Sequence, residues 1–148
     1  MGEITVAEMT AADIPAVYAL ELICFTAPWT MEAYRDELDN PTSYYLTAKQ
    51  DGEVVGFGGM WAIVDEAHIV TLATSPAHRR QGIARQLMTV FMAEAKARGV
   101  RDITLEVRIG NTPARALYES FGFQSLAIRK NYYPDNGEDG VIMGVKVG

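Results

Sequence analysis

Cysteine and histidine are nearly absent from this chain. Cys24 is the single cysteine among 148 residues, which excludes an internal disulfide and a cysteine-rich metal site. His68 and His78 are the only histidines, and their number and spacing are poor for a zinc site. We therefore expect no bound metal. No motif pairs a histidine with Cys24, so we interpret Cys24 as a small apolar residue and both histidines as structural or solvated.

Long apolar runs and an excess of positive charge are also missing. No apolar stretch is long enough to span a bilayer, and residues 1–10 lack the basic and apolar segments of a signal peptide. These features predict a cytoplasmic protein without membrane contact. The net charge of −6 argues against direct nucleic-acid binding, which needs a basic surface. A basic protein or an amine would be a compatible substrate.

The composition is that of an ordinary globular protein, with 49% hydrophobic and 22% charged residues. This length predicts one domain over residues 1–148. Period-2 and period-3.6 patterns alternate along it, so we predict a mixed α/β (α+β) sheet fold with about seven strands and four helices. The predicted strands are Glu3–Glu8, Tyr44–Lys49, Val54–Ile63, a run ending near Thr74, Asp102–Arg108, Phe123–Arg129 and Val141–Val147. The predicted helices follow Thr10, Thr30, Gly82 and Asn111.

Some of these elements carry specific signals. Asp51-Gly52 is typical of a hairpin turn, and Gly99 stands where a helix would end in a left-handed residue. Asp102–Arg108 alternates strictly, which places Glu106 on the face opposite its apolar residues. The first helix is expected to bury one stripe of side chains. Its members are Ile14, Val17, Tyr18, Leu22 and Phe25.

The stretch Ile69–Leu87 combines a β-branched run, a short loop and the start of a helix at Gly82. The first amides of a helix have no intrahelical partner, and the helix dipole adds positive charge there. Glycine lets a phosphate approach the backbone, and Arg79 and Arg80 stand beside it. The stretch therefore predicts an anion site; the alternative is an ordinary helix start with a solvated arginine pair.

Several motifs resemble the GNAT acetyltransferase superfamily. Arg79–Ala84 resembles its acetyl-CoA signature, and Leu105–Arg108, Asn111 and Ala116–Phe123 follow in the order and spacing of that superfamily. Other segments resemble its RimI-type branch of protein N-terminal acetyltransferases, which includes the ribosomal-protein-alanine enzymes. These segments are Phe25–Thr30, Ile128–Pro134, Glu138-Asp139 and Val141–Met143. The resemblance covers nearly the whole chain.

The resemblance implies acetyl-CoA as co-substrate. Its pyrophosphate would be bound by the segment Arg79, Arg80, Gln81, Gly82, Ile83, Ala84 and Arg85. Backbone at Leu72, Ala73 and Thr74 would hold the pantetheine arm and point an amide at the thioester oxygen, for which a strand bulge would free the amides. Asn111 would also contact the arm, unless it is only a turn or capping residue.

Glu106 and Tyr118 are the implied catalytic pair. An α-amine with a pKa of about 8 is mostly protonated at neutral pH, so Glu106 would remove its proton directly or through water. Tyr118 would protonate the leaving thiolate. The alternatives are a solvent-facing Glu106, or one paired with Arg108, and a Tyr118 that only packs in the core.

The acceptor site is indicated less sharply. Trp29, Tyr132 and Tyr133 could form aromatic walls for a peptide, and Glu138 and Asp139 could attract its amino group. The alternative is that these residues only pack two long loops together. No feature of the sequence indicates the oligomeric state, monomer or weak dimer.

The favoured hypothesis is acetyl transfer to the N-terminal α-amine of a protein, such as the alanine of a ribosomal protein, by direct attack in a ternary complex. Two alternatives stay open. The acceptor could be a lysine or a small amine, or the chain could be an acyl-CoA-binding sensor or interaction module without turnover.

Overall fold

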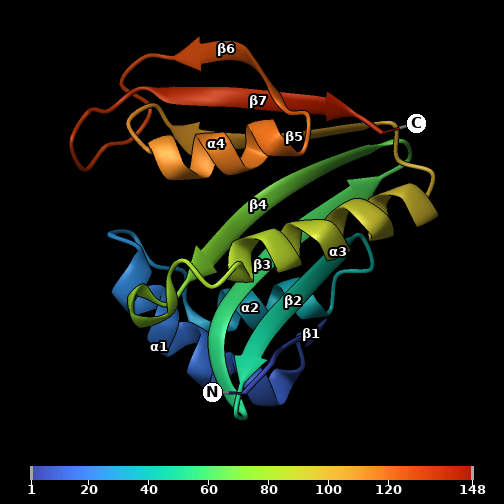
Figure 1. Cartoon of the computed structure of the whole chain (residues 1–148), viewed down its shortest axis with the longest axis vertical. Coiled ribbons are helices and arrows are strands. Elements are labelled where there is room, and N and C mark those ends of the chain that lie inside the picture. Colours follow the sequence, from blue (N-terminus) through green and yellow to red (C-terminus); the bar gives the residue numbers. More distant parts are fainter. Residues whose placement is uncertain (1, 148) are drawn as a thin grey trace.

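A computed structural model describes residues 2–147 and contains one seven-stranded sheet (Figure 1). The strands are β1 (Ile4–Glu8), β2 (Ser43–Gln50), β3 (Glu53–Ile63), β4 (Glu66–Thr74), β5 (Asp102–Arg108), β6 (Gln124–Arg129) and β7 (Gly140–Lys146). The α-helices are α1 (Ile14–Cys24), α2 (Met31–Leu38), α3 (Ile83–Ala97) and α4 (Thr112–Ser120). Short 3-10 turns cover Ala11–Asp13 and Pro76–His78. The predicted set of strands and α-helices is confirmed for these residues.

The strand order is β1-β2-β3-β4-β5-β7-β6, and β4 and β5 form the parallel pair in an otherwise antiparallel sheet. Figure 1 shows α3 lying across β2, β3 and β4 and α4 lying against β5. The residues of α3 and α4 share one apolar core, whereas α1 and α2 cover the opposite face with a second core. Within residues 2–147 no helix is long and apolar enough to cross a membrane.

The turn, the helix end and the strand alternation predicted from local sequence are present in the structure. Asp51 and Gly52 both have positive φ, at 52° and 81°, so the β2–β3 hairpin turns tightly. Gly99 ends α3 at φ 79°. Strand β5 buries Ile103, Leu105 and Val107 and turns its other residues to the opposite face.

The predicted stripe of α1 is wrong at Leu22 and at Phe25, which follows the end of the helix at Cys24. Leu22 is 52% exposed, whereas the neighbouring Glu21 is buried, at 2%. The Glu21 carboxylate accepts hydrogen bonds from the Tyr34 hydroxyl and, at 3.1 Å, from the backbone N–H of Trp29. Apolar periodicity does not register a carboxylate that is buried because it has polar partners.

The sheet divides between β4 and β5. Residues Glu66–Ile69 of β4 pair with residues Asp102–Leu105 of β5, and beyond these residues the two strands separate. The register of β3 and β4 shifts at the same level, where Gly59 faces Thr71 and Met60 faces Ile69. Val70 is therefore an extra residue, a β-bulge that bends β4 away from its neighbour.

Candidate functional site

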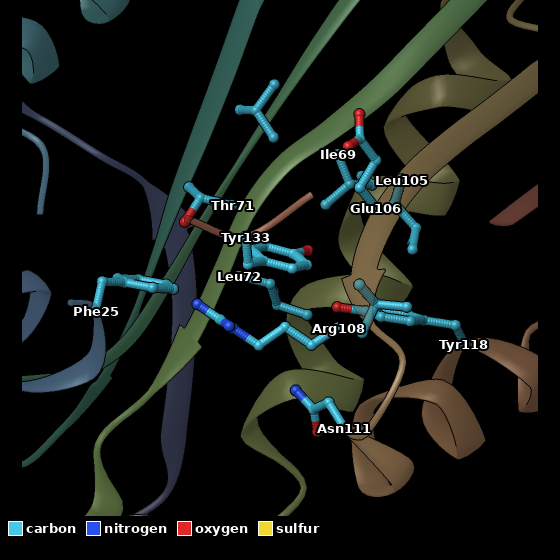
Figure 2. A pocket seen from close by; sticks show the side chains of 12 residues that line it. Phe25, Ile69, Thr71, Leu72, Leu105, Glu106, Arg108, Asn111, Tyr118 and Tyr133 are labelled. Atoms are coloured by element: carbon cyan, nitrogen blue, oxygen red, sulfur yellow. The ribbon is translucent and has the colours of Figure 1, made fainter. Parts of the chain in front are cut away.

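A pocket of about 250 Å³ lies where β4 and β5 separate (Figure 2). Its walls come from β4, β5, the α1–α2 connection, the start and middle of α4, and the β6–β7 loop. The lining residues are Phe25, Ile69, Val70, Thr71, Leu72, Leu105, Glu106, Val107, Arg108, Asn111, Tyr118 and Tyr133. The pocket thus exists because the parallel pairing stops at Ile69.

Strand β4 forms one wall with the residues around its bulge. The bulge lies at Val70, two residues before the Leu72–Thr74 segment expected to supply backbone donors. Leu72 lines the pocket, but Ala73 and Thr74 do not. Ala73 is buried in the α1/α2 core, and the Thr74 carbonyl accepts a hydrogen bond from Cys24 Sγ at 3.6 Å. The β4 residues that line the pocket beside the bulge are therefore Val70 to Leu72, because a bulge interrupts strand pairing at its own position.

Strand β4 leads from the pocket toward the 79–85 loop, which opens α3. Arg80 and Gly82 both have positive φ, at 66° and 76°, and Gly82 is the residue before the first turn of α3. Among the described residues 2–147, no side chain caps this helix end, and none of their atoms lies within 4 Å of a Cβ added at Gly82. The first amides of α3 are therefore open to an anion.

Two further side chains of this loop contact other segments of the protein. The Gln81 amide oxygen accepts a hydrogen bond from the Gln50 side chain at 3.3 Å, and the Arg85 guanidinium lies 5.5 Å from the centre of the Phe121 ring. These contacts fix the loop on β2 and α4. The geometry fits the pyrophosphate role implied for residues Arg79–Arg85.

Glu106 lies on the pocket face of β5, as its alternation predicts. Its Oε2 atom is buried and has no hydrogen-bond partner within residues 2–147. Arg108 does not pair with Glu106, because it is bonded to other carboxylates. A buried carboxylate oxygen without a partner is costly unless a ligand or water satisfies it, which is typical of a functional group.

Tyr118 is at once a core residue and a pocket residue. Its ring is 8% exposed and packs 6.0 Å from that of Phe123, centroid to centroid, while its hydroxyl points into the pocket (Figure 2). Burial raises the pKa of Tyr118 to about 12, so the phenol remains a proton donor at neutral pH. Asn111 likewise lines the pocket and caps α4, accepting from the backbone N–H of Ala114 at 3.3 Å.

The β6–β7 loop, residues 130–139, covers the pocket from the side of β5. Tyr133 lines the pocket, and the more exposed Tyr132 packs edge-on against it with ring centroids 5.0 Å apart. The pKa of Tyr132 is raised, first of all by the Glu106 carboxylate near its hydroxyl. Both tyrosines are therefore near the proposed base, as an acceptor wall requires.

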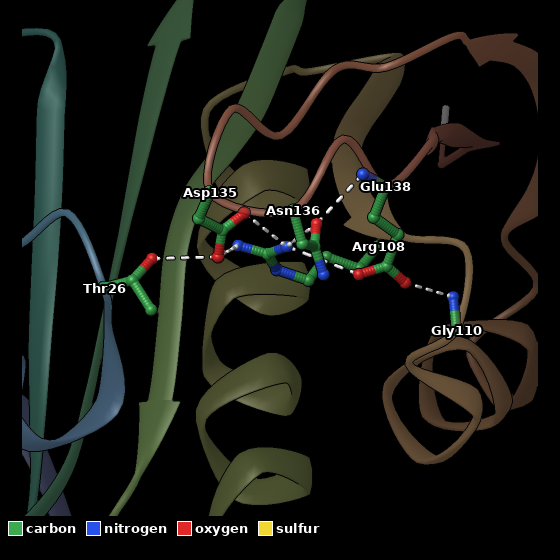
Figure 3. A network of polar contacts seen from close by, with 6 residues as sticks. All are labelled: Thr26, Arg108, Gly110, Asp135, Asn136 and Glu138. Atoms are coloured by element: carbon green, nitrogen blue, oxygen red, sulfur yellow. Dashed lines mark hydrogen bonds and ion pairs between the residues drawn. The ribbon is translucent and has the colours of Figure 1, made fainter.

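Glu138 and Asp139 are not free acids. Glu138 contacts Arg108 Nη1 at 3.3 Å and accepts from the backbone N–H of Gly110 at 2.8 Å (Figure 3). Asp139 accepts from the backbone N–H of Asn131 at 2.9 Å and lies 3.4 Å from Lys130 Nζ. Internal donors thus occupy both carboxylates and lower their pKa values, and their attraction of an amino group stays a prediction.

Arg108 is the centre of this loop network. It forms a two-pronged contact with Asp135, at 3.1 and 2.9 Å, and its guanidinium lies 4.1 Å from the centre of the Tyr133 ring. Asp135 also accepts from the Thr26 hydroxyl at 3.1 Å, so the network reaches the α1–α2 connection on the other side of the sheet division (Figure 3).

Trp29 does not line the pocket. Its ring packs in the second core, 5.3 Å from Tyr34 and 6.4 Å from Tyr45, because its backbone is tied to the buried Glu21. Phe25 lines the pocket from the same connection. Phe25 belongs to the Phe25–Thr30 motif, but helical periodicity predicts it on the stripe of the first helix, which ends at Cys24.

Comparisons with known proteins agree with this geometry. The model of the Acetyltransferase (GNAT) family matches residues 14–123. A Bacillus subtilis (strain 168) protein, named provisionally as a ribosomal protein bS18-alanine N-acetyltransferase, is 41% identical over 96% of this chain and 95% of its own length. The enzyme of that name from Escherichia coli (strain K12) is 35% identical over 97% of both chains.

The solved structures agree too. The crystal structure of the ribosomal-protein-S18-alanine N-acetyltransferase from Escherichia coli matches with a TM-score of 0.91 and 32% identity, over 99% of this chain and 95% of that one. The sequence relatives and the solved structure match nearly the whole chain, and the family model covers the 79–85 loop and every pocket residue except Tyr133. The chain therefore belongs to the GNAT acetyltransferase family.

Proposed function

We propose that this protein transfers the acetyl group of acetyl-CoA to the N-terminal α-amine of a ribosomal protein, with an alanine of the bS18 type as first candidate. One observation carries the proposal: an unpartnered Glu106 carboxylate oxygen and the Tyr118 hydroxyl line the same pocket, where β4 leads on to an uncapped helix start. A base and an acid at one thioester-sized pocket are what amide formation from a thioester needs.

The 79–85 loop would bind the pyrophosphate of acetyl-CoA, whose thioester supplies the activated acetyl group. Binding would use the free amides of α3 and the positive end of its dipole, with Arg79 and Arg80 adding charge. Leu72 and Asn111 line the pocket and would contact the pantetheine arm. Ala73 and Thr74 could contribute only through their backbone.

Glu106 would take a proton from the α-ammonium, directly or through water, so that the neutral amine attacks the thioester carbon. An amide N–H freed at the Val70 bulge would stabilise the resulting oxyanion. Tyr118 would then give its proton to the departing sulfur, and the second proton lost by the attacking nitrogen would restore the phenol. Its raised pKa keeps the proton on the phenol until the thiolate appears.

Phe25 and Tyr133 would enclose the first residue of the acceptor, and Tyr132 would extend this wall toward solvent. The choice of a ribosomal acceptor rests on the names of the relatives that are 35% and 41% identical. A ribosomal substrate also implies a cytoplasmic location.

A peptide panel tests the acceptor. An alanine-initiated peptide with a free α-amine should release CoA thiol, and the same sequence with its α-amine blocked and one lysine added should release almost none. Faster thiol release with the blocked peptide would support the lysine alternative. Acetyl-CoA binding without thiol release for any amine would support the sensor alternative.

A further inference from the structure

The proposed reaction leaves one proton in the pocket at every turnover. An α-ammonium carries three protons; one stays on the amide nitrogen, one ends on the CoA thiol and the third must leave. Glu106 receives that proton when the amine is activated, and it must lose it before the next turnover. Because Glu106 Oε2 is buried, and Tyr132 lies near its carboxylate, the proton needs a defined exit.

His68 lies beside Glu106, outside the pocket lining. It precedes the pocket residue Ile69 on β4 and faces Thr104 in the parallel register, with Nδ1 2.8 Å from the Thr104 hydroxyl oxygen. Thr104 and Glu106 are two residues apart on one strand, so all three side chains are on the same face of the sheet.

The ring of His68 is held in place. The Trp61 ring packs against it with centroids 5.4 Å apart and planes tilted by 32°, and the Thr104 contact fixes Nδ1. With Nδ1–H donating to the Thr104 hydroxyl oxygen, Nε2 has the free lone pair and is the nitrogen that can accept a proton. His68 is half-buried rather than enclosed. Of the neighbours on β3 and β5, Trp61 and Thr104 carry no charge, and Glu106 is the charged group that acts on it.

Burial lowers the pKa of His68, and the Glu106 carboxylate only partly opposes this effect. The imidazole is therefore neutral near pH 7 and can accept a proton. Once the proton has moved to His68, burial disfavours the charged imidazolium more than the restored Glu106 carboxylate favours it, so release to solvent is favoured.

We propose that His68 is a proton-relay residue that acts through Glu106: the protonated carboxyl transfers its proton to Nε2, directly or across pocket solvent, and the imidazole releases it to bulk water. Glu106 returns to the carboxylate, and no other bond changes. The inference rests on the proposed function, because it needs an amine that loses its proton at Glu106.

The test compares His68→Ala and His68→Gln with the wild-type protein, using thiol release from acetyl-CoA and an alanine-initiated peptide. Each variant should lose about 10- to 100-fold in kcat, which is at or below the low end of a proton-transfer contribution, with the KM for acetyl-CoA within about twofold. Added imidazole should restore part of the kcat of His68→Ala. Pyrazole, which has the same size but is a much weaker base, should not.

His78→Ala is the matched control, since it removes the other histidine; its kcat should be unchanged by imidazole. Wild-type kcat in both His68 variants, or equal rescue by imidazole and pyrazole, would overturn the relay and leave the acetyltransferase proposal intact. If His68→Ala does not fold, His68→Gln decides through its kcat. A wild-type protein that releases no thiol with any amine would contradict the proposed function and the relay together.

Discussion

The 79–85 loop and the 130–139 loop lie at the two ends of the proposed reaction, and they are built in different ways. The first gains its binding groups from backbone conformation: two positive φ angles and an uncapped helix start. The second is held by the Arg108 side chain of β5, which contacts Asp135, Glu138 and Tyr133, and by Thr26 from the α1–α2 connection. A local motif of seven residues suffices for the first, whereas the second needs three separate segments.

This difference indicates which substitutions should affect the binding of which substrate. A change of backbone freedom in the 79–85 loop should affect acetyl-CoA, and a change in the Arg108 network should affect the peptide. Glu106 stands between the two loops and should affect neither binding step.

Glu106→Gln should have the largest effect. It keeps the shape of the side chain but removes the proton acceptor, so kcat should fall about 10²- to 10⁴-fold. Acetyl-CoA affinity, measured by calorimetry, should stay at its wild-type value, because Glu106 is outside the 79–85 loop. A kcat within threefold of wild type would show that Glu106 is not the base.

Gly82→Ala should weaken acetyl-CoA binding about tenfold. A side chain at φ 76° costs about 1–2 kcal/mol in the left-handed region, so the loop would shift away from the conformation that frees its amides. Calorimetry of acetyl-CoA binding measures the effect.

Gly99→Ala is the matched control for that change. Gly99 has φ 79°, and like Gly82 it has open space where a Cβ would stand, but it ends α3 instead of starting it. Both variants should lose similar thermal stability. Equal losses of acetyl-CoA affinity would show that strain in α3, and not the loop itself, is responsible.

Arg108→Gln should raise the KM of the peptide about two- to tenfold, the cost of ordering one or two released side chains on binding. The KM of acetyl-CoA should be unchanged. Steady-state kinetics with each substrate varied in turn give the two values.

Arg98→Gln controls for the loss of an arginine as such. Arg98 contacts Glu94 at 2.8 Å and lies 5.2 Å from the centre of the Tyr44 ring, so it repeats the chemistry of Arg108 on α3. Peptide KM should not change in this variant. If Arg108→Gln also leaves it unchanged, the 130–139 loop does not position the acceptor.

The smallest expected effect is a loosening of the 130–139 loop at acid pH. Hydrogen bonds and nearby cations lower the pKa values of Asp135, Glu138 and Asp139 in the folded state. Their stabilisation is therefore complete above the ordinary carboxyl pKa of about 4 and is lost as the pH falls through the depressed values. The network should be intact from pH 5 to pH 8.

Amide resonances in an NMR titration can follow this loss. The N–H groups of Gly110 and Asn131 donate to Glu138 and Asp139, so their shifts should titrate below about pH 4. The N–H of Gly99 donates to the backbone carbonyl of Lys96 and should not titrate in that range. Titration of all three together would indicate general unfolding in place of loop release.

Much of the fold and of the site follows from local patterns. The alternation of Asp102–Arg108 places Glu106 opposite the buried layer, and the Gly82 helix start is a local conformation. Position on a strand or helix face depends only on residue spacing, so these features can be predicted without knowing the neighbours. Tyr118 is predictable for the same reason, although the face it shares is both core and pocket wall.

Other features arise only where distant segments meet. Trp29 turns into the core because Glu21 and Tyr34 hold it, Phe25 takes a place in the pocket, and Glu138 is occupied by Arg108. The bulge at Val70 and the end of pairing at Ile69 depend on the registers of β3, β4 and β5 together. The sequence by itself therefore determined the 79–85 loop and the faces of Glu106 and Tyr118, because spacing and backbone freedom are local. Only the tertiary structure decided the pocket, its Phe25 and Tyr133 walls and the neighbourhood of His68, because these depend on which strands and loops lie side by side.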